Sequence, residues 1–259
     1  MMDDEGLRLE REEAVVTLVL NRPQRQNAID QATWRRLAWW CEELEHDPGT
    51  RVVVIRGEGM AFSAGADIGE FTQVFADERA AHAYNELVQD ALGRLERLTK
   101  PTIAQIHGNC IGGGCALAVA CDLRFAADGA KLGITPARLG LAYSLGDVRR
   151  LAALVGPARA KDLLFSARLM EAAEAQRVGL VDRTVSRPEL DETVRDYARN
   201  IVRLSGNSQR LIKVMFGLVA SGQEEDDAHS RALRDEAVLH PDFLEGRQAF
   251  LERRPPRFT

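Results

Sequence analysis

The stretch HGNCIGGGCALAVACD, residues 107–122, decides how the rest of the chain is interpreted. Three consecutive glycines, Gly112 to Gly114, open onto a run of small apolar residues that predicts a buried helix. Because glycine has no Cβ, a ligand atom or another backbone segment can come close to the chain there. No acid, base or nucleophile follows directly, since Ala116 comes after Gly-Gly-Gly-Cys. The stretch therefore indicates a close approach to the backbone without an obvious catalytic side chain.

Two kinds of phosphate-binding loop can be tested against these glycines. Gly108 and Gly113 have the spacing of a P-loop, but Gly114 stands where the lysine must reach the phosphates. Cys115 replaces the hydroxyl group that would bind magnesium. The dinucleotide pattern G-x-G-x-x-G is also absent, because the segment reads G-N-C-I-G-G-G. Neither phosphate loop fits.

A zinc site is a further alternative, because four possible ligands fall within fifteen residues: His107, Cys110, Cys115 and Cys121. Cys115 and Cys121 are six residues apart on one predicted helix, which places them on different faces. No pair recurs at the spacing of a structural zinc site. We therefore expect no metal, and we expect the cysteines to act as small apolar residues.

The remaining interpretation is an oxyanion site. Gly113 lies at or just before a helix start, where N–H groups have no partner within the helix and the helix dipole favours negative charge. A second donor could come from the other glycine-containing loop, SAGAD (63–67). Two such donors would stabilise a thioester enolate. Alternatively, the glycines only allow tight packing of the helix on a strand.

Composition excludes several classes of protein. The 259 residues are 45% hydrophobic and carry a formal net charge of −5, and no long Lys/Arg block stands out, which disfavours nucleic acid and anionic membranes as partners. No apolar run approaches the ~20 residues of a membrane span, and no basic region precedes an apolar one at the start. We expect a cytoplasmic protein. The basic clusters Arg22/Arg25 and 252–258 could meet a phosphate-bearing ligand or form solvated surface.

Periodicity and turn residues predict strands alternating with helices in the first two thirds of the chain. Asp30 is placed to cap a helix, and a long amphipathic stretch runs from about Leu190 to Val219. Strands are expected over 14–23, 51–57, 102–108 and 123–127, with a further helix over 79–99. The pattern predicts an α/β core over 1–200 followed by a helical region over 201–259.

Five segments together resemble the crotonase superfamily, also called the enoyl-CoA hydratase/isomerase family. They are LNRPQRQNAI, FSAGADIGEF, KPTIAQIHGNCIGGGCALAVACDLRFAA, LVGPARAKDLLFSARLMEAAEAQRVGLVDRTV and EGRQAFLERRPPRF. The resemblance implies a fold of repeated ββα units with a C-terminal helical region that builds trimers, often paired into hexamers. It also implies a CoA thioester as substrate, with coenzyme A entering as part of that substrate and no separate cofactor.

The resemblance also assigns site residues. The two N–H groups around the thioester carbonyl would belong to Ala66 and Gly113. The pantetheine and adenine of CoA would run past five positions: Arg25, Ala28, Ala64, Asp67 and Ile68. Asp67 could equally cap its own loop, and Arg25 could be a solvated side chain.

The chain departs from the family where hydration needs acids. The two hydratase glutamates would stand at the substrate-facing positions of Ala116 and Pro136, and the later acid of isomerases and dehalogenases at Ser144. None of the three is acidic, so glutamate-assisted hydration is not expected. TPARLGLAYSL (135–145) resembles methylmalonyl-CoA decarboxylases, in which the residue matching Tyr143 helps to hold the substrate carboxylate. That branch, however, has histidine at the Ala66 position and glutamate at the Ala116 position.

Other side chains could supply an acid. Asp147 has adjacent arginines and is expected in a local ion pair, while Glu70 could reach the acyl end or face solvent. We therefore expect an enzyme that stabilises an enolate, with Tyr143 and Ser144 as the polar groups nearest the reacting carbons. Decarboxylation or isomerisation is favoured over standard hydration. The alternatives are an inactive acyl-CoA-binding protein and a hydratase using an acid that we have not located.

Overall fold

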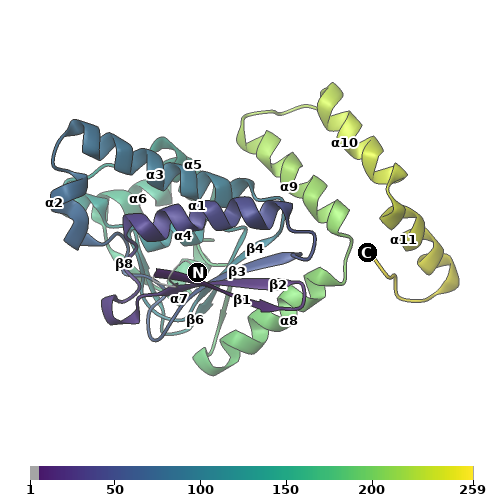
Figure 1. Cartoon of the computed structure of the whole chain (residues 1–259), viewed down its shortest axis with the longest axis horizontal. Coiled ribbons are helices and arrows are strands. Elements are labelled where there is room, and N and C mark those ends of the chain that lie inside the picture. The colour runs from purple at the N-terminus through teal and green to yellow at the C-terminus, as the bar shows by residue number, and fades with distance from the viewer. Residues whose placement is uncertain (1–5, 259) are drawn as a thin grey trace.

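The structure is a computed structural model that describes residues 6–258. Figure 1 shows an α/β body with a separate group of helices at the C-terminal end. The strands are β1 (Gly6–Glu12), β2 (Val15–Asn21), β3 (Val52–Gly57), β4 (Thr102–Ile106), β5 (Cys110–Ile111), β6 (Leu123–Ala127), β7 (Lys131–Gly133), β8 (Leu169–Glu171) and β9 (Arg183–Val185). The α-helices are α1 (Gln31–His46), α2 (Phe71–Val74), α3 (Glu78–Arg97), α4 (Gly113–Ala120), α5 (Leu145–Val155), α6 (Pro157–Ser166), α7 (Ala172–Arg177), α8 (Leu190–Val202), α9 (Gly206–Ala220), α10 (Ala228–Leu239) and α11 (Pro241–Glu252).

The main sheet has the strand order β1-β2-β3-β4-β6-β9. Its first pair is an antiparallel hairpin, and the other pairs are parallel. A second, small sheet has the order β5-β7-β8. Parallel strands need crossover connections, which the helices supply. The α/β class expected from the sequence is therefore confirmed.

The central strands are covered on both faces, as Figure 1 shows for α1 and α3 on one side and α8 on the other. Successive side chains of a strand point to opposite faces. In β3, Val53 and Ile55 pack into the cluster beneath α1 and α3, whereas Val52 and Val54 pack against α8. Burial on both faces explains why these strands are continuously apolar in the sequence.

The expected helix starts are confirmed. The side chain of Asp30 accepts a hydrogen bond of 2.8 Å from Thr33 N, and it caps α1 as predicted. The apolar run after the glycines forms α4, in which every residue from Gly114 to Ala120 is buried. Gly112, the residue before α4, has φ +53°, a backbone conformation that favours glycine.

The C-terminal third differs from the sequence prediction in one respect. The stretch from Leu190 to Val219 is not one helix but two, α8 and α9, which are separated at Arg203–Ser205. Ser205 begins α9 by accepting a hydrogen bond of 3.1 Å from Ser208 N, so a capping residue starts a new helix within the amphipathic stretch. The division into a core over 1–200 and a helical region over 201–259 stays a prediction.

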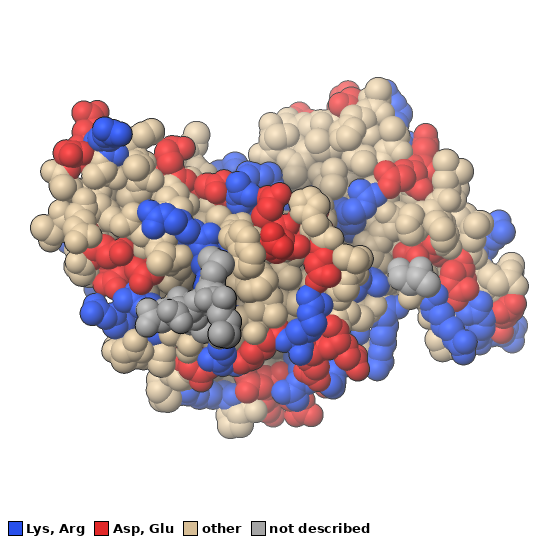
Figure 2. Space-filling view, in the orientation of Figure 1, with Lys and Arg blue, Asp and Glu red and all other residues tan. Residues whose placement is uncertain are grey.

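The surface carries both signs of charge. On the face shown in Figure 2, acidic and basic side chains are interspersed and form no broad field of one sign. This agrees with the modest net charge of −5. Within residues 6–258, no helix combines the length and the apolar character that crossing a lipid bilayer requires.

Candidate active site

Two backbone segments lie side by side at the start of α4. Ser63 N donates to Asn109 O and Ile111 N donates to Ser63 O, both at 2.9 Å, so the loop 63–67 runs parallel to β5. The next turn of this loop is fixed by Ile29, whose N–H donates to Gly65 O at 2.7 Å and whose carbonyl accepts from Asp67 N at 2.9 Å. The two glycine-containing segments expected to form one site therefore meet.

The backbone N–H groups of Ala66 and Gly113, which we call the site amides, belong to two segments that lie close together. A Cβ placed on Gly113 would lie 3.3 Å from Ala66 N, and a Cβ on Gly65 would lie 3.2 Å from Gly113 N. Within residues 6–258 neither of these N–H groups has a hydrogen-bond acceptor. Two neighbouring backbone N–H groups are thus left without an acceptor in this part of the chain, as an oxyanion site would require.

Glycine is present at Gly112, Gly113 and Gly114 for different structural reasons. Gly112 adopts a positive φ, and a Cβ on Gly113 would intrude between the site amides. Gly114 is a packing residue, since its Cβ would lie 2.6 Å from the Cβ of Ser63. Tight packing, one of the two interpretations from the sequence, therefore applies to Gly114, and the approach of a ligand to Gly113 stays a prediction.

The carbonyl of Gly112 is an acceptor for two donors. Ala116 N donates to it at 3.0 Å as the first turn of α4, and the hydroxyl of Tyr143 donates to it at 3.0 Å. Burial raises the pKa of Tyr143 well above its usual value, so this hydroxyl stays protonated at neutral pH. The structure thus brings Tyr143 to the glycine run, with its proton directed at the backbone.

Ser144 lies at the start of α5 and caps it. Its Oγ accepts a hydrogen bond of 3.0 Å from Asp147 N and donates one of 2.7 Å to Asp147 Oδ2. Asp147 is buried and also pairs with Arg150 at 2.8 Å, as expected from the adjacent arginines. Arg150 in turn donates to Glu96 at 2.9 Å. This network joins α5 to α3, and within it Ser144 has a structural role.

Ion pairs shape the loops expected to hold CoA. Asp67 caps the short helical turn after it through Gly69 N at 3.0 Å and pairs with Arg22 at 2.8 Å. Burial raises the pKa of Asp67, but these hydrogen bonds and the charges of Arg22 and Arg25 outweigh it, and the pKa lies below its usual value. The guanidinium of Arg25 is exposed, 3.6 Å from Asp67. The loop surface near it is formed by Ala28, Ala64 and Ile68, of which Ala64 and Ile68 are exposed.

Comparison with known proteins identifies the family to which this chain belongs. Residues 10–259 match the model of the family described as enoyl-CoA hydratase/isomerase. The chain belongs to this family, within the crotonase superfamily. It is 37% identical to a probable enoyl-CoA hydratase of Mycobacterium bovis, over 100% of this chain and 99% of the relative. A crotonyl-CoA hydratase of Syntrophomonas wolfei is 34% identical, with 98% of each chain covered.

Solved structures of the family agree with the fold. An enoyl-CoA hydratase/isomerase family protein of Hyphomonas neptunium superposes with a TM-score of 0.95 at 40% identity, covering 98% of this chain and 97% of that one. An enoyl-CoA hydratase of Bacillus anthracis gives a TM-score of 0.88 at 31% identity, with 98% and 99% covered. The crotonase-type α/β fold expected from the sequence is therefore confirmed.

At the positions where the resemblance to the family's hydratases expects acids, this chain has none. Ala116 is buried in the first turn of α4, and Pro136 begins the short helical turn Pro136–Leu139. The carboxylate of Glu70 accepts a hydrogen bond of 2.8 Å from Gln31 N, the first backbone N–H of α1. The carboxylates of Glu70, Asp67 and Asp147 are therefore each engaged in hydrogen bonds or ion pairs within the protein.

Two residues near the site amides carried no functional signal in the sequence. Trp34 is a core position of α1, and its Cζ2 would lie 3.5 Å from a Cβ on Gly113. The hydroxyl of Thr135 would lie 3.5 Å from a Cβ on Gly112. Helical spacing marks Trp34 as apolar, but only the tertiary fold places it beside the glycines.

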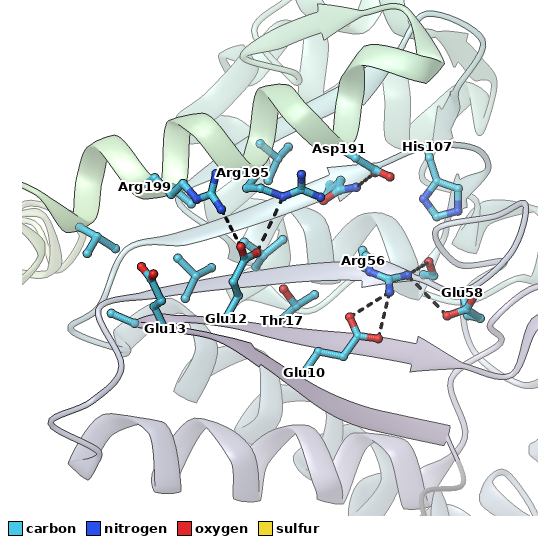
Figure 3. A pocket seen from close by; sticks show the side chains of 18 of the residues that line it. Glu10, Glu12, Glu13, Thr17, Arg56, Glu58, His107, Asp191, Arg195 and Arg199 are labelled. Atoms are coloured by element: carbon cyan, nitrogen blue, oxygen red, sulfur yellow. Dashed lines mark hydrogen bonds and ion pairs between the residues drawn. The ribbon is translucent and has the colours of Figure 1, made fainter.

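A cavity of about 720 Å³ lies on the face of the main sheet that α8 covers, between β1–β4 and α8 (Figure 3). Its charged side chains are largely paired with one another. Glu12 contacts Arg199 at 2.6 Å, and Arg56 contacts Glu10 at 3.0 Å. Burial lowers the pKa of His107 at its edge, which favours the neutral ring. The residues lining this cavity do not include either site amide.

The cysteines are free and buried. Burial raises the pKa of Cys41 and of Cys121 to about 12 each. A thiol with such a pKa is almost fully protonated at neutral pH and is a poor nucleophile. The cysteines therefore fit the small apolar role expected from the sequence.

Proposed function

We propose that this protein binds an acyl-CoA thioester and stabilises its enolate between the N–H groups of Ala66 and Gly113. The observation that carries the proposal is the close approach of these two backbone amides, each without an acceptor among residues 6–258. Both are backbone groups fixed by the surrounding hydrogen bonds, so they need little reorganisation when charge develops on the oxygen. Each such donor can lower the barrier by about 3 kcal/mol.

The CoA part of the substrate would lie over two loops, 22–28 and 63–68, which the contact between Arg22 and Asp67 joins. Arg25 is exposed there and can approach a phosphate, since its contact with Asp67 is a loose 3.6 Å. Ala28, Ala64 and Ile68 would provide the surface for pantetheine and adenine, while Asp67 itself shapes the loop. Coenzyme A enters as part of the substrate in this proposal, and no separate cofactor is assigned.

The reaction that this site favours begins without a carboxylate base. Asp67, Glu70 and Asp147 are held by Arg22, Gln31 N and Arg150, respectively. In decarboxylation of a malonyl-type thioester, the bond between Cα and the carboxylate breaks and CO₂ leaves. The electron pair stays on Cα as the enolate, which the site amides stabilise, and Cα then takes a proton from solvent. No base is needed to begin this sequence.

Isomerisation is the second reaction that the sequence favours, but it must move a proton between two carbons. That step requires a proton carrier, and the held carboxylates do not offer one. Hydration is supported by relatives that are named as hydratases, among them the crotonyl-CoA hydratase that is 34% identical. It would require an acid at a position other than Ala116 and Pro136. An inactive acyl-CoA-binding protein is the alternative from a different functional class.

The test is mass spectrometry of acyl-CoA thioesters incubated with the purified protein in D₂O. The panel contains crotonyl-, 3-enoyl-, malonyl- and methylmalonyl-CoA, and the control is the Gly113→Ala variant. Loss of CO₂ that the variant does not catalyse supports decarboxylation. Added water indicates hydration, and solvent deuterium without another mass change indicates isomerisation. An unchanged panel with measurable CoA binding would replace the enzyme by a binding protein.

We further propose the trimer or hexamer that the sequence resemblance implies. Exposed apolar side chains gather on the C-terminal helices, and most of the visible surface around α9 and α10 is uncharged in Figure 2. The large exposed apolar side chains on α9, α10 and α11 are Ile212, Phe216, Val219, Val238, Leu239, Phe243, Leu244, Phe250 and Leu251. Such a surface is typical of an interface. Light scattering of the purified protein measures the assembly, and the cytoplasmic location stays a prediction.

A further inference from the structure

We propose that Tyr143 is a positioning residue of the oxyanion site, acting through the peptide group between Gly112 and Gly113. Its hydroxyl donates to the carbonyl oxygen of Gly112 at 3.0 Å. The same peptide group carries the N–H of Gly113, one of the two site amides. The inference rests on the proposed function, because it explains how one of the proposed donors is oriented and strengthened.

A peptide group is planar, so its carbonyl oxygen and its N–H hydrogen point in opposite directions and move together. Fixing the oxygen of Gly112 therefore fixes the direction of the Gly113 N–H. This peptide needs such support, because it joins Gly112, at φ +53° and ψ −118°, to a second glycine, Gly113. Glycine has the widest conformational freedom of any residue. The hydroxyl of Tyr143 supplies a fixed point outside the glycine run.

The Gly112 carbonyl accepts from both sides. Ala116 N donates at 3.0 Å from within α4, and Tyr143 donates from the segment before α5. Each donor withdraws electron density from the carbonyl and makes the N–H of the same peptide a stronger donor. Such polarisation along a chain of hydrogen bonds is about 10–30% per bond. The gain is largest when negative charge develops on the thioester oxygen.

The position of Tyr143 suits this role. Its ring packs against the main hydrophobic core, and burial keeps the pKa of the hydroxyl well above neutral. Tyr143 is half-buried, so its bond to Gly112 is partly shielded from water, and such shielding strengthens a hydrogen bond. Thr135, by contrast, is near Gly112 without a hydrogen-bond partner for its hydroxyl in residues 6–258.

This role differs from the one that the resemblance to decarboxylases assigns. A tyrosine that holds a substrate carboxylate matters only for substrates that have one. A tyrosine that polarises the Gly112–Gly113 peptide acts on every thioester carbonyl in the site. Acetyl-CoA, which has no carboxylate on its acyl group, separates the two roles.

The experiment is difference infrared spectroscopy of acetyl-CoA labelled with ¹³C at the thioester carbonyl. It compares the wild type, Tyr143→Phe and a matched control, Tyr197→Phe, whose ring lies on the α8 side of the sheet against Phe125. We expect the wild type and the control to shift the carbonyl stretch to lower frequency on binding. Tyr143→Phe should give a smaller shift, with the dissociation constant of free CoA unchanged within about twofold.

A second replacement guards against a variant that is simply misfolded. Replacing Tyr143 by 3-fluorotyrosine makes the hydroxyl a stronger donor while keeping its shape, so the carbonyl shift should become larger than in the wild type. Damage to the fold cannot produce that increase. For a thioester that the protein turns over, Tyr143→Phe should lower kcat about 3- to 10-fold with little change in KM, the effect of losing one hydrogen bond.

The outcomes separate the two proposals. If wild-type protein binds acetyl-CoA without shifting its carbonyl stretch, the oxyanion site itself is wrong. If the wild type shifts it and both Tyr143 replacements give the wild-type shift, the oxyanion site stands and the role of Tyr143 is overturned. Opposite changes in the phenylalanine and fluorotyrosine proteins support it.

Discussion

The guanidinium of Arg22 contacts the carboxylate of Asp67 at 2.8 Å and thereby joins the two loops over which CoA is proposed to lie. The same guanidinium donates to Ala28 O at 2.8 Å and contacts Asp30 at 3.0 Å. Asp67 is 8% exposed at its side chain, so the pair is largely shielded from water. Arg22 therefore connects three parts of the chain: its own loop 22–28, the start of α1 at Asp30, and the loop 63–68 that contains Asp67.

Asp67→Asn is expected to loosen this junction. The variant keeps the shape of the side chain but loses the charge that Arg22 pairs with, and a hydrogen bond to a charged group contributes about 1.5–3 kcal/mol. We expect a loss of that order in the free energy of unfolding in urea, together with weaker CoA binding in calorimetry. The control is Asp90→Asn, which removes an exposed pair with Arg94. Equal losses in both proteins would contradict the special position of Asp67.

Gly113→Ala is expected to remove activity without removing the fold. The added methyl group would lie 3.3 Å from Ala66 N and 3.5 Å from Trp34 Cζ2, within the space between the site amides. Losing one oxyanion donor lowers kcat about 100- to 1000-fold in other enzymes. Circular dichroism and urea unfolding should stay close to the wild type. Gly129→Ala is the control, because its Cβ would meet nothing within 4 Å. Full turnover by the Gly113 variant would refute the oxyanion assignment.

Much of the fold could be predicted from the sequence because it depends on local signals. Asp30 and the apolar spacing after it predicted α1, and the apolar runs predicted the central strands. The edge strand β1 was not predicted, because GLRLERE mixes charged residues with few apolar ones. Charges are common on edge strands, where they prevent pairing with other chains. The break between α8 and α9 was missed because the amphipathic pattern continues across it.

The candidate site could be predicted only as far as the backbone. The two glycine-containing segments were expected to meet, and they do. The roles of individual side chains depend on partners far away in the sequence, such as Glu70 with Gln31 N, which are 39 residues apart. No periodicity shows that Glu70 accepts from the first backbone N–H of α1, or that the Tyr143 hydroxyl faces a glycine carbonyl.

Ser144→Ala is expected to affect stability rather than chemistry. The serine caps α5, and losing such a cap costs about 1 kcal/mol. Ser205→Ala is a close control: Ser205 caps α9 and donates to Asp242 at 2.6 Å, as Ser144 donates to Asp147 at 2.7 Å. We expect similar losses in urea unfolding and unchanged kcat in both variants. A tenfold lower kcat in the Ser144 variant alone would instead give this serine a part in the reaction.

The stability of the protein should depend on pH through Glu96. Burial raises the pKa of Glu96, but hydrogen bonds from Arg149 and from Arg150, at 2.9 Å, outweigh it, so the pKa lies below the ordinary value of 4.5. A carboxyl group with a lower pKa in the folded state stabilises the fold fully above its unfolded pKa. This contribution is lost as the pH falls from about 4.5 through the lowered value, because the unfolded chain takes up the proton first.

Glu96→Gln tests this dependence. The variant cannot ionise and leaves the buried Arg150 with one charged partner, Asp147, in place of two. We expect the wild type to be more stable than the variant by about 1–3 kcal/mol at pH 7. The difference should shrink as urea unfolding is repeated at successive pH values below 4.5. Glu86→Gln, on the exposed side of the same helix, should show little difference at any of these values. A difference for Glu96 that stays constant or widens in acid would show that its charge is not what stabilises the junction of α3 and α5.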